Sequence, residues 1–124
     1  MARILVIDDE PGMLVRLGNI FRRRGHEVVL ADLRRKGVNL FQQEHPHVTI
    51  LALKMSEMDG LAVLREIRTR DPHAPVIIMT GFGTEERERQ ARELGVTEFV
   101  PKGFTLHILG AALDRVLTQI GRTM

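Results

Sequence analysis

Short runs of mostly apolar residues recur along the chain and are separated by segments with a different periodicity. Four runs are strong and the last is weaker: Ile4–Ile7, Val28–Leu30, Val48–Leu51, Val76–Met79 and Phe99–Val100. Because apolar positions are continuous rather than alternating, the runs predict strands that are covered on both faces. Between them, apolar residues recur at helical spacing, most clearly at Leu106, Leu109, Leu113, Val116 and Ile120. Strand and helix therefore alternate five times.

This alternation predicts a parallel sheet with helices on both faces, since parallel neighbours need a crossover connection, usually a helix. Pro11 suits the first turn of the first helix. Turn residues are expected to end three of the helices, at Gly25, Asp71-Pro72 and Gly95. No linker or repeat interrupts the pattern, so residues 1–124 are expected to form a single α/β domain.

The fourth predicted helix, roughly residues 84–94, differs from the others because it is highly charged and has few apolar anchors. Glu85 with Arg89, and Glu88 with Arg92, have the i,i+4 spacing of helical ion pairs. Two interpretations stay open. The helix is either a solvated, salt-bridged element or a weakly docked element that can shift, since few buried contacts lower the cost of local opening.

Composition narrows the functional classes. The formal net charge is only +2, and five Phe with no Trp or Tyr leave few platforms for base stacking, so direct nucleic-acid binding is not expected. The absence of cysteine excludes disulfide frameworks, thiol nucleophiles and thiolate metal sites. The first apolar run has four residues, too short for a membrane span. We therefore expect a cytoplasmic protein without a membrane anchor.

Polar residues follow four of the predicted strands, where ligands bind in open parallel sheets. These segments are Asp8-Asp9-Glu10, Ala52-Leu53-Lys54, Thr80-Gly81 and Pro101-Lys102-Gly103. Taken singly, the acidic pair could cap a helix and the lysine could be solvated. Together, paired carboxylates suit a hard cation, and a lysine and a hydroxyl suit a phosphoryl group. The set predicts a phosphoryl-binding site that has no nucleophile.

Four stretches carry a resemblance to a known family: Ile4–Pro11, Met58–Leu61, Val76–Thr80 and Phe99–Lys102. In combination and order they resemble the receiver domain of two-component response regulators, over nearly the whole chain. The resemblance implies a flavodoxin-like, doubly wound (βα)5 fold with a five-stranded parallel sheet in the order 2-1-3-4-5. It also implies a role in phosphorelay signalling.

The resemblance places a magnesium site at the first and third strands. Asp8 and Asp9 match the acidic pair that binds magnesium, and Lys54 would offer its backbone carbonyl to the same ion. In the family the third strand ends with the aspartate that accepts the phosphoryl group, and the register of the Met58–Leu61 stretch puts Ala52 there. A methyl group cannot attack phosphorus, so we expect no catalytic residue and no enzymatic activity. With one carboxylate fewer, magnesium is expected to bind weakly, and no organic cofactor is expected.

The resemblance also assigns a switch and a set of partners. Thr80 matches the switch hydroxyl, Phe99 the aromatic switch position and Lys102 the lysine that contacts phosphate. A histidine kinase or another signalling protein would bind the face formed by the fourth helix, the fifth strand and the fifth helix. The family further implies an output domain outside this segment.

Alanine at position 52 has three explanations: natural divergence, an engineered substitution, or transfer of the phosphoryl group to another residue. Ser56 and Gly103 stand where the family usually has proline, which favours natural divergence. A flavodoxin-like nucleotide-binding or flavin-binding domain is the alternative from a different class. Its phosphate loop needs Gly, Ser or Thr after the first strand, where Asp8-Asp9-Glu10 would repel a phosphate.

Two further groups of residues have no assigned role. None of the five histidines has metal-site spacing, and His45 and His47, which flank Pro46, are expected to be solvated. The basic run Arg22-Arg23-Arg24 closes a helix, where positive charge complements the dipole. The run Arg34-Arg35-Lys36 leaves contact with an acidic partner open.

Overall fold

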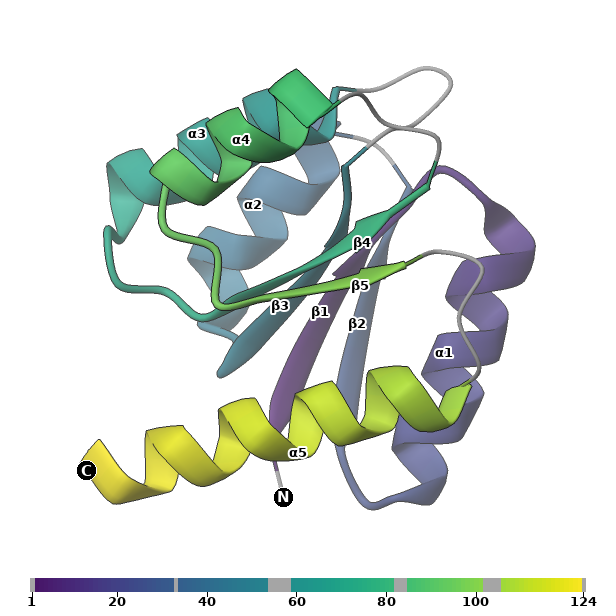
Figure 1. Cartoon of the computed structure of the whole chain (residues 1–124). Helices are drawn as coiled ribbons and strands as arrows, with labels where there is room; N and C mark the ends of the chain where they lie inside the picture. The colour runs from purple at the N-terminus through teal and green to yellow at the C-terminus, as the bar shows by residue number, and fades with distance from the viewer. Residues whose placement is uncertain (1, 33, 54–58, 82–84, 102–105, 124) are drawn as a thin grey trace.

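The computed structural model describes residues 2–32, 34–53, 59–81, 85–101 and 106–123. Within these residues, five parallel strands alternate with five helices: β1 (Arg3–Ile7), α1 (Pro11–Arg23), β2 (Glu27–Ala31), α2 (Arg34–Glu44), β3 (Val48–Ala52), α3 (Gly60–Arg70), β4 (Val76–Thr80), α4 (Glu85–Glu93), β5 (Glu98–Pro101) and α5 (Leu106–Thr123). They form one sheet in the order β2-β1-β3-β4-β5 (Figure 1). The predicted fold class and strand order are confirmed.

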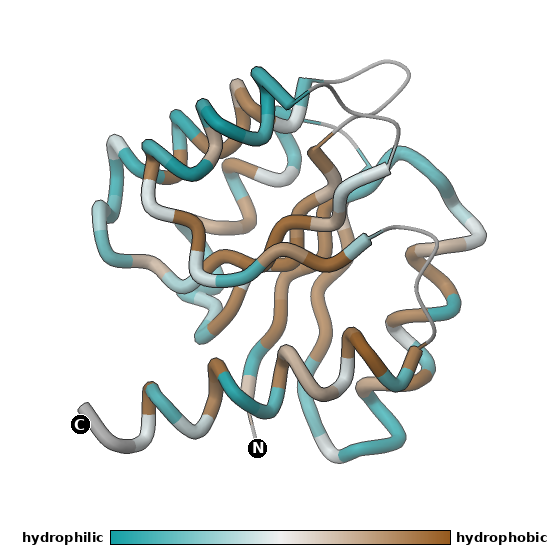
Figure 2. The backbone as a smooth tube through the Cα atoms, viewed as in Figure 1, coloured by the Kyte–Doolittle hydropathy of each residue, from teal (hydrophilic) through white to brown (hydrophobic). Residues whose placement is uncertain are grey.

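The sheet lies between two layers of helices. Helices α1 and α5 cover one face, and α2, α3 and α4 cover the other (Figure 1). The strands form the hydrophobic centre of the molecule (Figure 2), and every residue of β3 is buried. The expectation that all strands are covered on both faces is wrong for β2 and β5, which are half-buried over most of their length. Both are edge strands, so each has a neighbour on one side only.

The predicted turn residues adopt the expected backbone conformations. Pro11 occupies the start of α1, and Asp71 is the C-cap of α3. Gly25 and Gly95 have φ values of 91° and 86°, the left-handed conformation that glycine adopts without a steric penalty. These residues reverse the chain at the ends of α1 and α4, which lets β2 and β5 enter the sheet.

Helix α4 is attached to the domain mainly by polar contacts. Ala91 is its one buried residue, whereas α3 buries five, and Figure 2 shows α4 as largely hydrophilic. The Arg65 guanidinium of α3 donates to the Gln90 side chain at 3.0 Å. The two helices are therefore held by directional bonds as well as by a small apolar contact.

Arg68 of α3 makes the strongest of these links. Its guanidinium donates to the carbonyl oxygens of Leu94 and Gly95, both at 2.6 Å, at the carboxyl end of α4. It also donates to the carbonyls of Ala74 at 2.8 Å and Asp71 at 3.3 Å. One side chain thus fixes the end of α4 to the end of α3 and to the chain that leads into β4.

The ion pairs within α4 differ from those expected from spacing. Arg89 pairs with Glu86 and Glu93, not with Glu85. Hydrogen bonds from Arg89, and then from Gln90, lower the pKa of Glu86 to about 2. Arg92 does not pair with Glu88 but lies over an aromatic ring of β5, described below.

No helix in the described residues is long and apolar enough to cross a membrane.

Candidate functional site

The candidate residues converge at the carboxyl edge of the sheet. The last rung between β1 and β3 pairs Ile7 with Leu51, so Asp8 and Ala52 follow it side by side on adjacent strands. Ala52 is paired with Met79 of β4. Since neighbouring strands lie about 4.8 Å apart, the Ala52 methyl belongs to the same small region as Asp8.

Asp8 is the buried acid of this edge. It is fully buried, its backbone N–H donates to the Ala31 carbonyl at 3.1 Å, and its Oδ1 accepts from the Glu10 N–H at 3.1 Å. The N-cap of α1 is Glu10, which makes no side-chain capping bond, so helix capping does not account for Asp8. Asp9, the next residue, is half-buried. The pair therefore presents one enclosed and one partly solvated carboxylate.

The end of β3 is closed by a tight backbone contact with α3. Ala52 is fully buried, and the Leu53 N–H extends the ladder by donating to the Met79 carbonyl at 3.0 Å. The Gly60 N–H then donates to the Leu53 carbonyl at 3.1 Å. A Cβ on residue 60 would stand 2.5 Å from the Leu53 oxygen and closer still to the Ala52 oxygen. Only glycine fits, so the start of α3 is fixed against the end of β3.

Asp59 joins this contact to α4. Its Oδ1 accepts from the Leu61 N–H at 3.0 Å, which caps α3, and the same oxygen is ion-paired with Arg87 of α4. Asp59 therefore has a clear structural role, and it couples the edge of the site to the first half of α4. Neither the cap nor the ion pair was predicted from the sequence.

Thr80 and Phe99 occupy the two strands at the other side of the edge. Thr80 is the half-buried last residue of β4 and pairs with Pro101, while Phe99 of β5 pairs with Ile78. The Phe99 ring is half-buried, and the Arg92 guanidinium of α4 lies 4.3 Å from its centroid, a cation–π contact. The structure thus brings the predicted switch pair to adjacent strands and adds a contact with α4.

Four positions singled out in the sequence lie outside the described residues. They are Lys54, Ser56, Lys102 and Gly103. The proposed carbonyl ligand and the proposed phosphate-contacting lysine are therefore predictions from the sequence.

The chemistry of two residues at this edge is compatible with a hard cation. Asp8 and Asp9 supply two carboxylates, whereas the buried end of β3 supplies the methyl group of Ala52. Among the described residues, no group of three or more His, Asp or Glu is arranged to hold a metal ion. Magnesium is commonly bound through one or two carboxylates and completes its shell with water. The two acids could therefore hold it, with less charge than a three-carboxylate site.

Comparison with known proteins identifies the family. Residues 4–114 match the family described as the response regulator receiver domain. This chain belongs to that family. A crystal structure of a response regulator receiver domain protein from Clostridium thermocellum superimposes with a TM-score of 0.91 at 32% identity, over 100% of both chains.

The sequence relatives of this receiver domain include long and short proteins. The regulatory protein AtoC of Escherichia coli is 35% identical over 115 residues, which are 93% of this chain and 25% of AtoC. Sporulation initiation phosphotransferase F of Bacillus subtilis is 27% identical over 93% of each chain. The chain thus spans about a quarter of AtoC and nearly all of the shorter relative. These similarities do not favour a flavin-binding domain.

Two histidines of the receiver domain have structural roles that the sequence analysis missed. The Ala2 N–H donates to Nδ1 of His26 at 3.1 Å, and the Arg3 N–H donates to Nδ1 of His47 at 2.9 Å. His47 is exposed, as expected, but its Nδ1 also accepts this backbone hydrogen bond, which was not predicted. Each histidine comes just before a strand that flanks β1. This shared position in the sequence could have indicated that both imidazoles lie near the start of β1.

Proposed function

We propose that this receiver domain acts as a signalling module that does not carry a phosphoryl group on the third strand. The proposal depends on one observation: the residue that ends β3, beside Asp8, is the fully buried Ala52. A methyl group offers no lone pair to phosphorus, so an acyl phosphate cannot form at this position. Signalling must then depend on the binding of other proteins.

In this proposal Asp8 and Asp9 would hold magnesium weakly. The ion, when bound, supplies positive charge that offsets the repulsion between the two carboxylates. Lys102, by its match to the family, would contribute positive charge to the same region. Thr80 and Phe99 keep the positions of a switch, but a ligand shifts a conformational equilibrium only through its different affinities for the two states. Without a phosphoryl group, that difference has to come from a partner.

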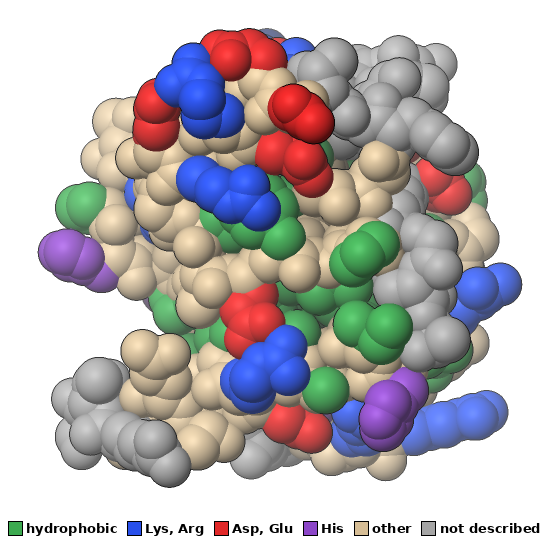
Figure 3. Space-filling view, in the orientation of Figure 1, with side chains coloured by type: hydrophobic (Ala, Val, Ile, Leu, Met, Phe, Trp, Pro, Cys, Tyr) green, Lys and Arg blue, Asp and Glu red, His purple; other side chains and the backbone are tan. Residues whose placement is uncertain are grey.

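The partner surface that we propose consists of α4, β5 and α5. Figure 3 shows acidic and basic side chains intermixed over α4. On the same surface, Arg115 of α5 donates two hydrogen bonds of 2.6 and 2.8 Å to the Glu98 carboxylate of β5. The same face also exposes hydrophobic side chains (Figure 3), and a mixture of charged and apolar groups is typical of non-obligate interfaces. A histidine kinase or another signalling protein would bind this surface. An output domain could bind it as well, since the match to AtoC covers only 25% of that protein and leaves room for further domains there.

Mass spectrometry of the intact protein tests the central proposal. The unmodified chain and the Ala52→Asp variant are incubated with acetyl phosphate and magnesium. We expect a phosphoryl adduct on the variant and none on the unmodified chain. An adduct on the unmodified chain would show that another residue accepts the group. Absence of an adduct on both chains would mean that position 52 is not where the acceptor would stand.

The location and the remaining functional classes follow from the same proposal. We place the domain in the cytoplasm, without direct binding to nucleic acid and without enzymatic activity of its own. Absorbance of the purified protein in the visible range tests the alternative from another class, since a bound flavin would be yellow.

A further inference from the structure

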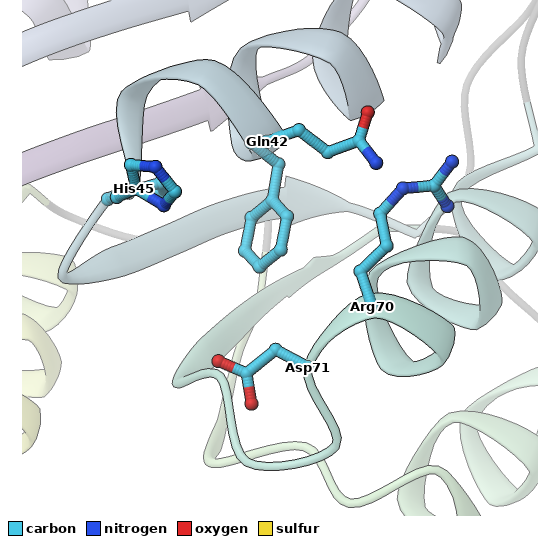
Figure 4. Close-up of a pocket in the computed structure, with 6 residues that line it drawn as sticks. Gln42, His45, Arg70 and Asp71 are labelled. Atoms are coloured by element: carbon cyan, nitrogen blue, oxygen red, sulfur yellow. The ribbon is translucent and has the colours of Figure 1, made fainter.

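Residues of α2 and α3 line a groove, and both helices lie on the opposite side of the sheet from α1 and α5 (Figure 1). It consists of two adjoining hollows of about 540 and 350 Å3, and Arg70 lines both of them. In the smaller hollow, Gln42 of α2 and Arg70 of α3 extend toward each other from the two helices (Figure 4). We refer to both hollows together as the α2–α3 groove.

Three guanidinium groups line this groove: Arg34 and Arg35 of α2 and Arg70 of α3. Arg34 is neutralised, because its Nε and Nη2 donate to the two carboxylate oxygens of Glu66, both at 3.2 Å. Arg70 reaches only the backbone carbonyl of Glu66, at 3.1 Å. No carboxylate in the described part of the chain is ion-paired with Arg35 or Arg70. Arg35 and Arg70 are therefore guanidinium groups that are not ion-paired within the described residues, although the pKa of Glu66, lowered first by its hydrogen bond from Arg34, is lowered by the charge of Arg70 as well.

The charged residues of α2 also interact unfavourably with its helix dipole. Its first turn contains Arg34, Arg35 and Lys36 with no acid, and its last turn contains Glu44 with no base. Cations near the positive end of a helix dipole, and anions near the negative end, are unfavourable by a few tenths to about 1 kcal/mol each. Helix α4 has the favourable order, with three acids in its first turn. Helix stability thus gives no reason for the basic cluster of α2.

We propose that the α2–α3 groove binds an acidic peptide segment of a partner protein. Guanidinium groups bind carboxylates through paired, charge-assisted hydrogen bonds, and arginine clusters are a recurrent means of binding acidic motifs. The eleven residues of α2 extend about 16 Å, which matches roughly five residues of extended peptide. Asn39 and Gln42 also line the groove and offer amide groups to a peptide backbone.

The composition of the groove favours a peptide over a nucleic acid. Glu66 and Asp71 also line the groove and would repel an acidic ligand of either kind, so the preference depends on the aromatic side chains. Phe41 is only 9% exposed, so the groove offers no exposed Phe, Tyr or Trp as a stacking platform. This surface is separate from the α4–β5–α5 surface, so the inference goes beyond the proposed function and does not depend on it.

The test is fluorescence anisotropy with a fluorescein-labelled hexaglutamate peptide at low ionic strength. The groove variant is Arg35→Gln combined with Arg70→Gln. The control variant, Arg16→Gln combined with Arg23→Gln, removes the same charge from exposed positions of α1, on the other side of the sheet. All three proteins are first compared by thermal melting, since substitutions of exposed arginines should leave the fold intact.

We expect the groove variant to bind the peptide about tenfold more weakly and the control variant to change by less than about twofold, since only the groove variant loses charge-assisted hydrogen bonds to the peptide. Amide resonances of α2 and α3 should shift on titration with the peptide. Equal losses in both variants would overturn the inference, because the attraction would then be diffuse. Absence of binding, or tighter binding of a thymidine oligonucleotide of equal charge, would overturn it as well.

Discussion

The carbonyl of Ala52 and the α-carbon of Gly60 lie so close that no side chain fits between them. This contact sets where α3 begins relative to the end of β3. Asp59, one residue earlier, caps α3 and pairs with Arg87, so the same turn also positions α4. The start of α3 is therefore held against the end of β3 by backbone atoms of residues 52, 53 and 60.

Substitution of Gly60 tests this constraint. We expect Gly60→Ala to lower the free energy of unfolding by at least about 2 kcal/mol, because the new methyl meets backbone atoms that cannot move aside. Gly12→Ala is the matched control, since its Cβ would meet nothing within 4 Å and α1 gains helix propensity. Urea denaturation measures both. If the two variants were equally stable, the close contact of Gly60 would be wrong.

Introducing a carboxylate at position 52 should make stability depend on magnesium. Ala52→Asp places a third acid beside Asp8 and Asp9, so repulsion is expected to lower the melting temperature of the metal-free protein. Added magnesium should then raise the melting temperature of this variant by several degrees and that of the unmodified chain much less. Ala52→Asn has a similar shape without the charge and serves as the control. A magnesium effect no larger in the aspartate variant than in the asparagine variant would contradict the geometry of the site.

His26 should make the domain less stable in mild acid. Burial, aided by positive charge that includes Arg24, lowers the pKa of His26 below its ordinary value of 6.5, although Asp114 opposes this. The folded state therefore favours the neutral imidazole, whose Nδ1 accepts from the Ala2 N–H. As the pH falls below 6.5, the unfolded chain binds this proton before the folded chain does, so stability is lost through that window.

Denaturation at a series of pH values between about 7 and 5 measures this loss. His26→Asn keeps an acceptor near the position of Nδ1 but does not titrate in this range. We expect its stability to fall less steeply than that of the unmodified chain. Identical slopes for the two proteins would show that His26 contributes nothing to the acid sensitivity.

Arg68 should control the attachment of α4. Arg68→Gln removes a guanidinium that is bonded to four carbonyls, and we expect a loss of about 2 kcal/mol of stability. Hydrogen exchange should accelerate by about tenfold in residues 85–93, because α4 has little buried apolar surface to hold it. Arg65→Gln, which loses one bond to Gln90, should have a smaller effect. Uniform acceleration over the whole chain would argue against a local role.

Removing the Thr49 hydroxyl should stabilise the domain. Thr49 lies in the central strand β3 and is only 1% exposed. Its Oγ1 has no hydrogen-bond partner among the described residues. Thr49→Val has the same shape without the polar atom, so a gain of about 1 kcal/mol is expected. Thr49→Ser keeps the hydroxyl and loses a methyl group, and should cost about 1 kcal/mol. A valine variant less stable than the unmodified chain would imply a bonded hydroxyl.

The sequence by itself determined the class and order of the elements. Continuous apolar runs, helical spacing between them, and the turn residues Gly25 and Gly95 are local properties, and they specify five strand–helix units without any tertiary information. The resemblance in a few stretches then fixed the order of the strands. Residues such as Asp8 and Ala52 could be placed side by side because strand ends meet at one edge of a parallel sheet.

Only the tertiary structure decided which polar groups meet across elements. Arg92 faces Phe99 instead of Glu88, Arg68 collects carbonyls from three segments, and His26 and His47 bind the backbone at the start of β1. Arginine and histidine side chains can form hydrogen bonds or ion pairs with many groups. Their spacing along one helix therefore does not determine which partner they bind. Position in the packed molecule does, because each group takes the acceptor that burial and strand order bring within reach.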